Sequence, residues 1–565
     1  MKKTINKIIV ASLFLVAVAT SCSDFDEINS KPNAFDPDEV SAKFFLTGTQ
    51  IKLYAPSRYS YWRAGLIHAD RYAGHFTFGF NGSWWNGGLG YYYNAAYTDA
   101  GFDWLSGYSG DLATLLKFVG EDGLLENEKY YAIGLVMKGL YYQMYTDIFG
   151  MLPYTDVGDS SVSLPTFDSQ ATIYEGVITE LNEAMQIIGS ETEIGDGLAG
   201  NDLFFNGDLQ KWKKLANSLK LRMALRAEGA PGATFAATAI TEAMSEQLLV
   251  GDNDNALMEK DTTIDQFTNA AYGDIWHNFG GLGSKWNVGE VLVSYLRDNN
   301  DPRLPFYAQP IAGGDVVFTK PTTGTGVSVF DKYIDFLLSK LDDANVPYTK
   351  IDNSDNITVS ITPGTYYVGQ PSRLNADIYA QVKPQLFSQP AAYITNAKNQ
   401  GLEIAPEVVF TSAEGNFLQA EAIVKGLASG DAQTAYQEGI IQSMKMWGAA
   451  DGDISNFIAS EKMALLNGST DENLEKIAVQ RWIAAYTNGF EAWAIVRDSG
   501  YPKQLAQGVS DFEIYSAGDL NGQYPGRLRY GNAAYNTNGS NTEAAIQTQG
   551  PDVQATKLWW AKSTI

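Results

Sequence analysis

The chain has 565 residues, 45% of them hydrophobic, and a formal net charge of −25 at pH 7. An acidic chain repels phosphate backbones and anionic lipid, so nucleic acid is excluded as an expected partner. A single cysteine leaves no internal disulfide, so a hydrophobic core must stabilise the fold, and the length suffices for one large domain or two.

Residues 1–21 have the pattern of an export signal. Lys2, Lys3 and Lys7 precede an apolar run over residues 8–19 that is too short to span a bilayer. Small residues then lead directly to Cys22, the only cysteine of the chain. We expect cleavage to leave Cys22 as the first residue, with its thiol lipidated. The alternative is an ordinary secretory signal with an incidental cysteine at the cleavage point.

Residues 22–40 are polar and acidic, which predicts an extended tether between a lipid and the fold. Several acyl chains on one cysteine would anchor the protein stably, at about 0.8 kcal/mol per buried CH₂ group. No later apolar run is long enough to span a membrane. The lipid is therefore the predicted membrane anchor.

Residues 41–228 are predicted to form an N-terminal helical scaffold that includes an aromatic loop region. Apolar residues recur at helical spacing over residues 112–119, 130–148 and 173–188. Asp208 is a predicted N-cap for a further helix over residues 209–223.

Residues 411–565 are predicted to form a C-terminal helical scaffold with an irregular tail from residue 521. Helical spacing recurs over residues 417–427, 436–447 and 475–485. The first two segments span about 34 residues with small residues at close-packing positions, as tetratricopeptide-like repeats do.

Residues 229–410, between the two scaffolds, are predicted to be a loop-rich insert. Periodicity weakens there, and Gly, Pro, Asn and Asp interrupt short runs. The expected fold class is mainly α, a tetratricopeptide-like helical scaffold that supports loops. Loops held on a rigid scaffold are where binding usually occurs.

The stretch over residues 58–104 carries the side chains that a sugar site needs. Sugar rings stack their C–H faces on aromatic planes, and their hydroxyls need amide or carboxylate partners. Glycines at positions 79, 82, 87, 88 and 90 break any long helix, which predicts a loop. The ligand-binding candidates here are Asp70, Arg71, Trp84, Trp85 and Asn86.

A second aromatic cluster in the insert is the candidate for the other wall of this site. Its ligand-binding candidates are Trp276, Asn278 and Trp286. The alternative for both clusters is that the aromatic rings pack against the scaffold or against a partner protein.

Catalytic and metal sites find little support in the sequence. His68, His75 and His277 are scattered and do not form a His-x-x-x-His zinc pair, and a lipidated Cys22 offers no thiol. Carboxylates are abundant, but no local motif singles out a glycosidase pair. We therefore expect a protein that is not an enzyme and has no metal and no cofactor, with packing roles for the histidines.

Several short motifs occur in a fixed order along nearly the whole chain. They are residues 25–29 (FDEIN), 31–33 (KPN), 145–150 (YTDIFG), 152–154 (LPY), 212–222 (WKKLANSLKLR), 480–482 (QRW), 489–493 (GFEAW) with Arg497, 500–502 (GYP), 527–530 (RLRY) and 558–560 (LWW). In order and spacing this set resembles the SusD/RagB nutrient-binding lipoproteins of Bacteroidetes, in particular the SusD-like branch. Acidic residues just after the lipidated cysteine accompany surface export in that group, and residues 24–27 are similar.

The resemblance implies a surface lipoprotein of the outer membrane, facing the cell exterior. It also implies a SusC-like TonB-dependent transporter as the partner, with the lipoprotein as a lid that traps an oligosaccharide. In the RagB-like alternative the cargo is peptide, and a surface glycoside hydrolase is a more distant reading. Most matching motifs are expected to pack in the interior, including Trp212, Asn217, Arg222, Trp482, Glu491 and Arg497.

Overall fold

The structure is a computed structural model, and it describes residues 41–78, 89–159, 161–195, 197–252, 254–260, 286–375, 382–395 and 404–561. The predicted signal peptide and tether, residues 1–40, lie outside the described residues. Within the described ranges, no helix combines the length and apolar character needed to cross a membrane.

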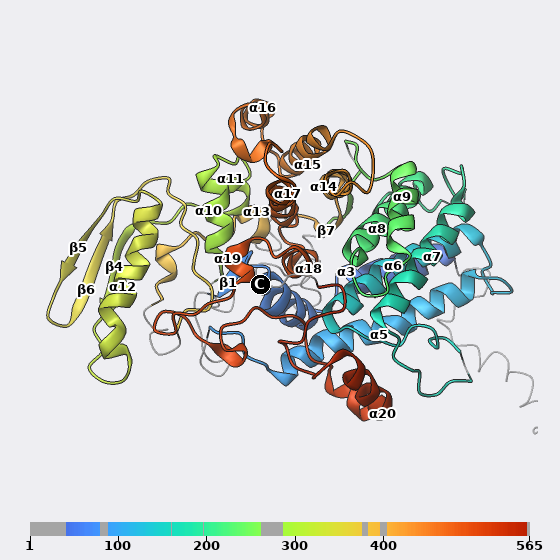
Figure 1. Ribbon diagram of the computed structural model, residues 1–565, viewed down its shortest axis with the longest axis horizontal. Helices are drawn as coiled ribbons and strands as arrows, with labels where there is room; N and C mark the ends of the chain where they lie inside the picture. Colours follow the sequence, from blue (N-terminus) through green and yellow to red (C-terminus); the bar gives the residue numbers. More distant parts are fainter. Residues whose placement is uncertain are drawn as a thin grey trace, which may run out of the picture.

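The N-terminal part is built from long helices that pack side by side. Figure 1 shows α6, α7, α8 and α9 grouped at one end of the molecule, and each contacts the next in turn. The elements are α3 (Ala42–Tyr54), α4 (Arg58–Ser60), the π-helix η2 (Tyr61–Asp70), α5 (Ala95–Val119), α6 (Glu128–Phe149), α7 (Gln170–Ile188), η3 (Ala199–Asn201), α8 (Leu209–Ala227) and α9 (Ala236–Ser245). The four helices predicted in this part are confirmed, and α5 starts well before its predicted range.

Asp208 begins α8 as the sequence predicts. Its carboxylate accepts hydrogen bonds from the backbone amides of Gln210 at 2.9 Å and Lys211 at 3.1 Å. These amides have no partner within the helix, so a carboxylate at this position satisfies them and fixes the first turn.

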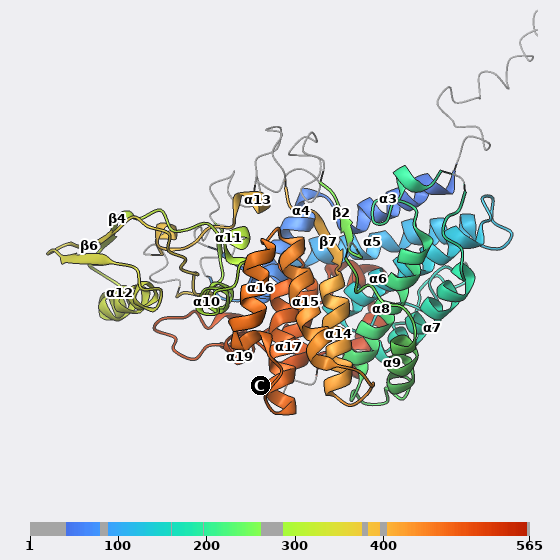
Figure 2. The same cartoon turned by 90° about the horizontal axis from the view of Figure 1, so that it is seen from above.

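The stretch predicted as a loop-rich insert contains more regular structure than expected. The strands β4, β6 and β5 form an antiparallel sheet in that order, and α12 lies beside it at the far end of the molecule (Figures 1 and 2). The elements are β2 (Ala256–Met258), β3 (Trp286–Val288), α10 (Glu290–Asp298), α11 (Leu304–Tyr307), β4 (Gly314–Thr319), α12 (Gly326–Asp343), β5 (Tyr348–Asp352), β6 (Asn356–Ile361), η6 (Pro384–Leu386), α13 (Ala392–Thr395) and β7 (Glu407–Phe410). Most of these elements are too short to show a clear period.

The C-terminal part contains the predicted helix pair α14 and α15, which pack against each other, with α17 against α14. The elements are α14 (Ser412–Val424), α15 (Ala432–Met446), α16 (Asp451–Ser460), η7 (Lys462–Ala464), α17 (Thr470–Ala484), α18 (Gly489–Ser499), α19 (Lys503–Ala506), η8 (Gly518–Leu520) and α20 (Asn532–Gln549). The tail from residue 521 was predicted to be irregular, and this is wrong for the residues that form α20. Its asparagines and glycine are weak helix formers, and Asn538 interrupts it with non-helical backbone angles.

A cluster of buried ion pairs joins helices from both ends of the chain. Arg226 of α8 bonds to Asp147 of α6 at 2.5 Å and to Glu491 of α18. Arg222, one turn earlier, donates from Nε to Oε1 of Glu414 in α14 at 2.7 Å. All of these side chains are buried. Glu491 and Glu414 therefore meet these arginines only when the N-terminal and C-terminal helices are both in place.

Trp212 is completely buried at the start of α8. Its indole Nε1 donates to Oδ2 of Asp202 at 2.8 Å, and Phe204 and Phe205 lie against its ring with centroids 5.6 and 5.5 Å away. The other side chains predicted to pack in the interior are also buried: Asn217, Arg222, Trp482, Glu491 and Arg497.

Candidate functional site

Two short strands connect the parts of the chain in which ligand contacts are predicted. The strand β1 (Phe76–Phe78) pairs antiparallel with β3, with Phe78 opposite Trp286. Phe78 is the last described residue before positions 79–88, and Trp286 is the first after positions 261–285. The pairing therefore places the residue before positions 79–88 and the residue after positions 261–285 at the same end of a two-stranded ribbon.

The predicted site residues fall into two groups. Trp84, Trp85, Asn86, Trp276 and Asn278 lie outside the described residues. The other predicted site residues are buried in the structure: Asp70, Arg71 and Trp286.

Trp286 packs in the interior and does not present its ring to a surface ligand. It is 1% exposed, and its ring lies 5.0 Å from that of Phe78, centroid to centroid, in an edge-on arrangement. This placement differs from the predicted ligand contact. The sequence pattern of a tryptophan next to glycines is the same for a ring that contacts a ligand and for a ring that packs in the core.

Arg71 supports the chain backbone at Leu89 and Gly90. The guanidinium is 4% exposed and donates to the carbonyl oxygens of Leu89 and of Gly90, the latter at 2.8 Å. It also lies 5.1 Å from the ring of Tyr91, which Arg373 contacts as well at 4.3 Å. Arg71 therefore holds this segment in position, which is a different role from the predicted contact with ligand.

Asp70 is likewise in the interior, at the end of η2, and is 3% exposed. Burial, together with the nearby carboxylate of Glu407, raises the pKa of Asp70 to about 8, and the Gly489 amide opposes this shift. The side chain is therefore protonated at neutral pH. The structure therefore places Asp70 as a neutral group in the interior, and its contact with a ligand stays a prediction.

The raised pKa of Asp70 predicts how stability depends on pH. Its ordinary pKa is 3.8, so between about pH 4 and 8 the folded state holds a proton that the unfolded chain has released. The free energy of unfolding should fall as pH rises through this window, by about 1.4 kcal/mol per pH unit for one proton. Asp70→Asn, whose amide does not ionise, should remove this part of the slope in urea titrations.

Asp335→Asn is the matched control for that experiment, because the Asp335 side chain is 68% exposed. It should leave the pH profile close to that of the wild type. Identical slopes for Asp70→Asn and the wild type would show that Asp70 does not carry the proton.

His68 and His75 are in contact with the backbone of the scaffold, and His277 lies outside the described residues. The Nδ1 atom of His68 lies 2.6 Å from the carbonyl oxygen of Arg63, and Nε2 of His75 lies 3.0 Å from that of Trp482. Burial lowers the pKa of His68 to about 4 and that of His75 to about 3, so both are neutral at pH 7. Across the described ranges, no group of three or more His, Cys, Asp or Glu side chains is arranged to hold a metal ion.

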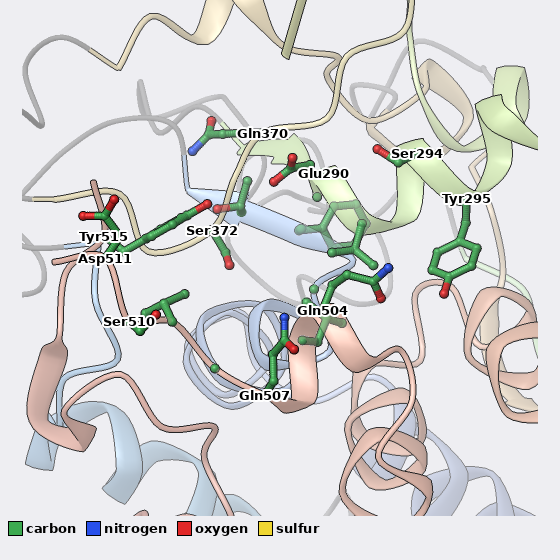
Figure 3. A pocket seen from close by; sticks show the side chains of 18 of the residues that line it. Glu290, Ser294, Tyr295, Gln370, Ser372, Gln504, Gln507, Ser510, Asp511 and Tyr515 are labelled. Carbon is green, nitrogen blue, oxygen red and sulfur yellow. The ribbon is translucent and has the colours of Figure 1, made fainter. Parts of the chain in front are cut away.

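A pocket of about 590 Å³ opens at the other end of the ribbon. Four stretches of chain line it: residues 74–77, 289–299, 370–372 and 504–515. Figure 3 shows Tyr295 and Tyr515 at opposite ends of the pocket, with Ser372, Gln504 and Gln507 between them. The sequence did not predict this pocket, because none of the four stretches carries a recognisable local motif.

Solved structures show which class of fold this is. A chitin-binding protein superposes with a TM-score of 0.70 at 23% identity, covering 93% of this chain and 100% of its own. A SusD-like protein from Bacteroides thetaiotaomicron gives 0.67 at 23% identity, covering 93% and 99%. A SusD homologue from Bacteroides uniformis gives 0.69 at 22% identity, covering 92% and 99%. At these identities the likeness establishes the SusD-like helical fold.

The family follows from the sequence match. The profile of the SusD-like family described as "Starch-binding associating with outer membrane" matches residues 39–329 and 335–531. The chain belongs to this SusD-like family, as its motifs predict. No curated protein matches it.

Proposed function

We propose that this protein is a surface lipoprotein of the outer membrane that binds an oligosaccharide and delivers it to a SusC-like TonB-dependent transporter. The observation that carries this proposal is the match, over most of the chain, to a family described as starch-binding and associated with the outer membrane. A structural relative described as a chitin-binding protein adds support for a saccharide as the cargo.

The proposed anchor is a lipid on Cys22, followed by the acidic tether of residues 22–40. Cys22 follows a short apolar run that ends in small residues, as lipoprotein signals do. Changing Cys22 to Ala should release the protein from isolated outer membranes or leave its signal uncleaved.

The proposed ligand site lies at the end of the ribbon where Phe78 pairs with Trp286. Trp84 is six residues beyond Phe78, so at roughly 3.5 Å per extended residue it lies within about 20 Å of the ribbon. Trp276 precedes Trp286 by ten residues, which permits a reach of about 35 Å. The two aromatic segments can therefore meet, with Asn86 and Asn278 available for sugar hydroxyls.

Loss of the two neighbouring tryptophans should weaken saccharide binding. A ring stacked on an exposed tryptophan contributes roughly 1 kcal/mol beyond area burial, so a Trp84→Ala, Trp85→Ala double variant should bind about five- to tenfold more weakly. A glycan array would first identify the saccharide, and calorimetric titration would then measure affinity. Trp559→Ala is the matched control, because this half-buried tryptophan donates to the carbonyl of Pro231 and packs against Tyr174, and neither residue belongs to the ribbon.

Unchanged affinity in a folded double variant would mean that Trp84 and Trp85 do not bind the saccharide. Their role would then be at a partner interface or in the core. Binding of peptides in place of saccharides would change the cargo and leave the delivery role intact. Delivery itself is tested by affinity purification from native membranes in mild detergent, which should recover a TonB-dependent transporter. Repeated absence of such a partner would remove the basis for delivery.

A further inference from the structure

The pocket at the other end of the ribbon has a rigid backbone wall. The amide of Gly289 donates to the carbonyl of His75 at 2.9 Å, and the amide of Glu290 donates to that of Gln370 at 3.0 Å. A Cβ atom on Gly289 would lie 2.0 Å from the carbonyl oxygen of Gly74, so only glycine allows this close approach. Three chain segments are therefore held together before any ligand enters.

Several polar side chains around the pocket are available to a ligand. Four side chains line the pocket, are partly or fully exposed, and form no hydrogen bond with other described residues: Ser294, Ser372, Gln507 and Ser510. Tyr295 and Tyr515 add aromatic rings at its two ends (Figure 3). This combination of hydroxyl, amide and aromatic groups suits a ligand that is rich in hydroxyls.

The charges around the pocket favour a neutral ligand. Among the described residues, its lining includes Glu290, Asp298 and Asp511 but no lysine, arginine or histidine. Each carboxylate already has a cation outside the lining: Lys340 lies 2.7 Å from Glu290, Arg297 lies 2.8 Å from Asp298, and Lys332 lies 2.9 Å from Asp511. An anion would meet three carboxylates, and a cation would have to compete with three existing ion pairs.

We propose that this pocket is a second binding site, for a short uncharged saccharide, separate from the site at the Phe78–Trp286 end of the ribbon. The inference rests on the proposed function in that the protein handles saccharides. The pocket volume of about 590 Å³ falls within the roughly 300–1,000 Å³ of small-molecule sites. Among the described residues, its lining includes Phe76 and Gly289 but neither Phe78 nor Trp286.

The test uses the purified full-length protein in mild detergent and saturation-transfer NMR. The probes are glucose, galactose, N-acetylglucosamine, maltose and N,N′-diacetylchitobiose. Ser294→Trp places an indole in the pocket, and Ser372→Trp does so from another wall. Ser455→Trp on α16 is the matched control, because Ser455 is an exposed helical serine outside the pocket.

We expect at least one probe to bind the Trp84→Ala, Trp85→Ala variant, since that variant leaves the pocket intact. In this background Ser294→Trp should weaken binding at least fivefold, and Ser455→Trp should not. Ser372→Trp provides the same test if Ser294→Trp lowers the melting temperature.

Two results would overturn the pocket proposal while leaving the proposed function in place. One is saccharide binding to the wild type that disappears entirely in the Trp84→Ala, Trp85→Ala variant. The other is binding that neither pocket variant changes. A neutral tripeptide that binds in place of the sugars and is blocked by Ser294→Trp would overturn the saccharide assignment. Absence of saccharide binding to the wild type would instead contradict the proposed function itself.

Discussion

Replacing Arg226 by Met should destabilise the fold by about 3–5 kcal/mol, because it removes the cation that bonds to two buried carboxylates. Arg226 bonds to Asp147 and Glu491, and all three side chains are buried. Burial alone would raise the pKa of Glu491, but Arg226, Arg222 and Arg481 together hold it below its ordinary value. Without Arg226, one of the two carboxylates must either stay charged in the interior or take up a proton.

Urea denaturation at pH 7 measures this loss. The control is Lys350→Met, which removes an exposed ion pair with Asp335 of 3.0 Å. Exposed pairs contribute little, so the control should unfold close to the wild-type midpoint. Equal midpoints for Arg226→Met and Lys350→Met would contradict the role of the buried cluster in stability.

Replacing Trp212 by Ala should have a similarly large effect, about 3–5 kcal/mol, through the cavity left by a buried indole. The indole also donates to Asp202, whose carboxylate accepts hydrogen bonds from Gln50 at 2.9 Å and from the Phe204 amide at 3.0 Å. The substitution should therefore loosen the start of α8 together with the 202–207 turn.

Trp212→Phe separates the two causes. Phenylalanine fills most of the volume but cannot donate to Asp202, so this variant should lose less stability than Trp212→Ala. The guanidinium unfolding midpoint of each variant, with near-ultraviolet circular dichroism to follow aromatic packing, gives the comparison. A Phe variant as unstable as the Ala variant would assign the whole effect to the hydrogen bond.

The sequence predicted the helical scaffold because its helices are long enough to repeat their apolar pattern. The range 173–188 and the cap at Asp208 both match the structure closely. The strands β1 and β3 have three residues each, which is too few to establish an alternation. The helix α20 is long enough to show a period, but its residues favour turns, so the sequence did not predict it. Tertiary packing holds these residues in a helix.

The candidate site was harder to predict than the fold. Aromatic residues mixed with Asp70 and Arg71 have the composition of a sugar site, but composition does not say which side chains face inward. Within that stretch, Arg71 donates to backbone carbonyl oxygens and Asp70 lies in the interior. The pocket that contains Tyr295 and Gln507 is assembled from stretches that lie more than 400 residues apart in the chain, from residue 74 to residue 515, and only the folded chain brings them together.

The buried ion pairs also bear on the order of events during biogenesis. Arg226 bonds to Glu491, which follows it by 265 residues in the chain. Asp147 accepts a hydrogen bond from the indole Nε1–H of Trp560, which follows it by 413 residues. Arg226 and Asp147 pair with each other within the N-terminal helices, but the rest of their buried partners come from the last part of the chain. Stable folding of the N-terminal helices is therefore expected only once residues 491 and 560 are available to pair with them.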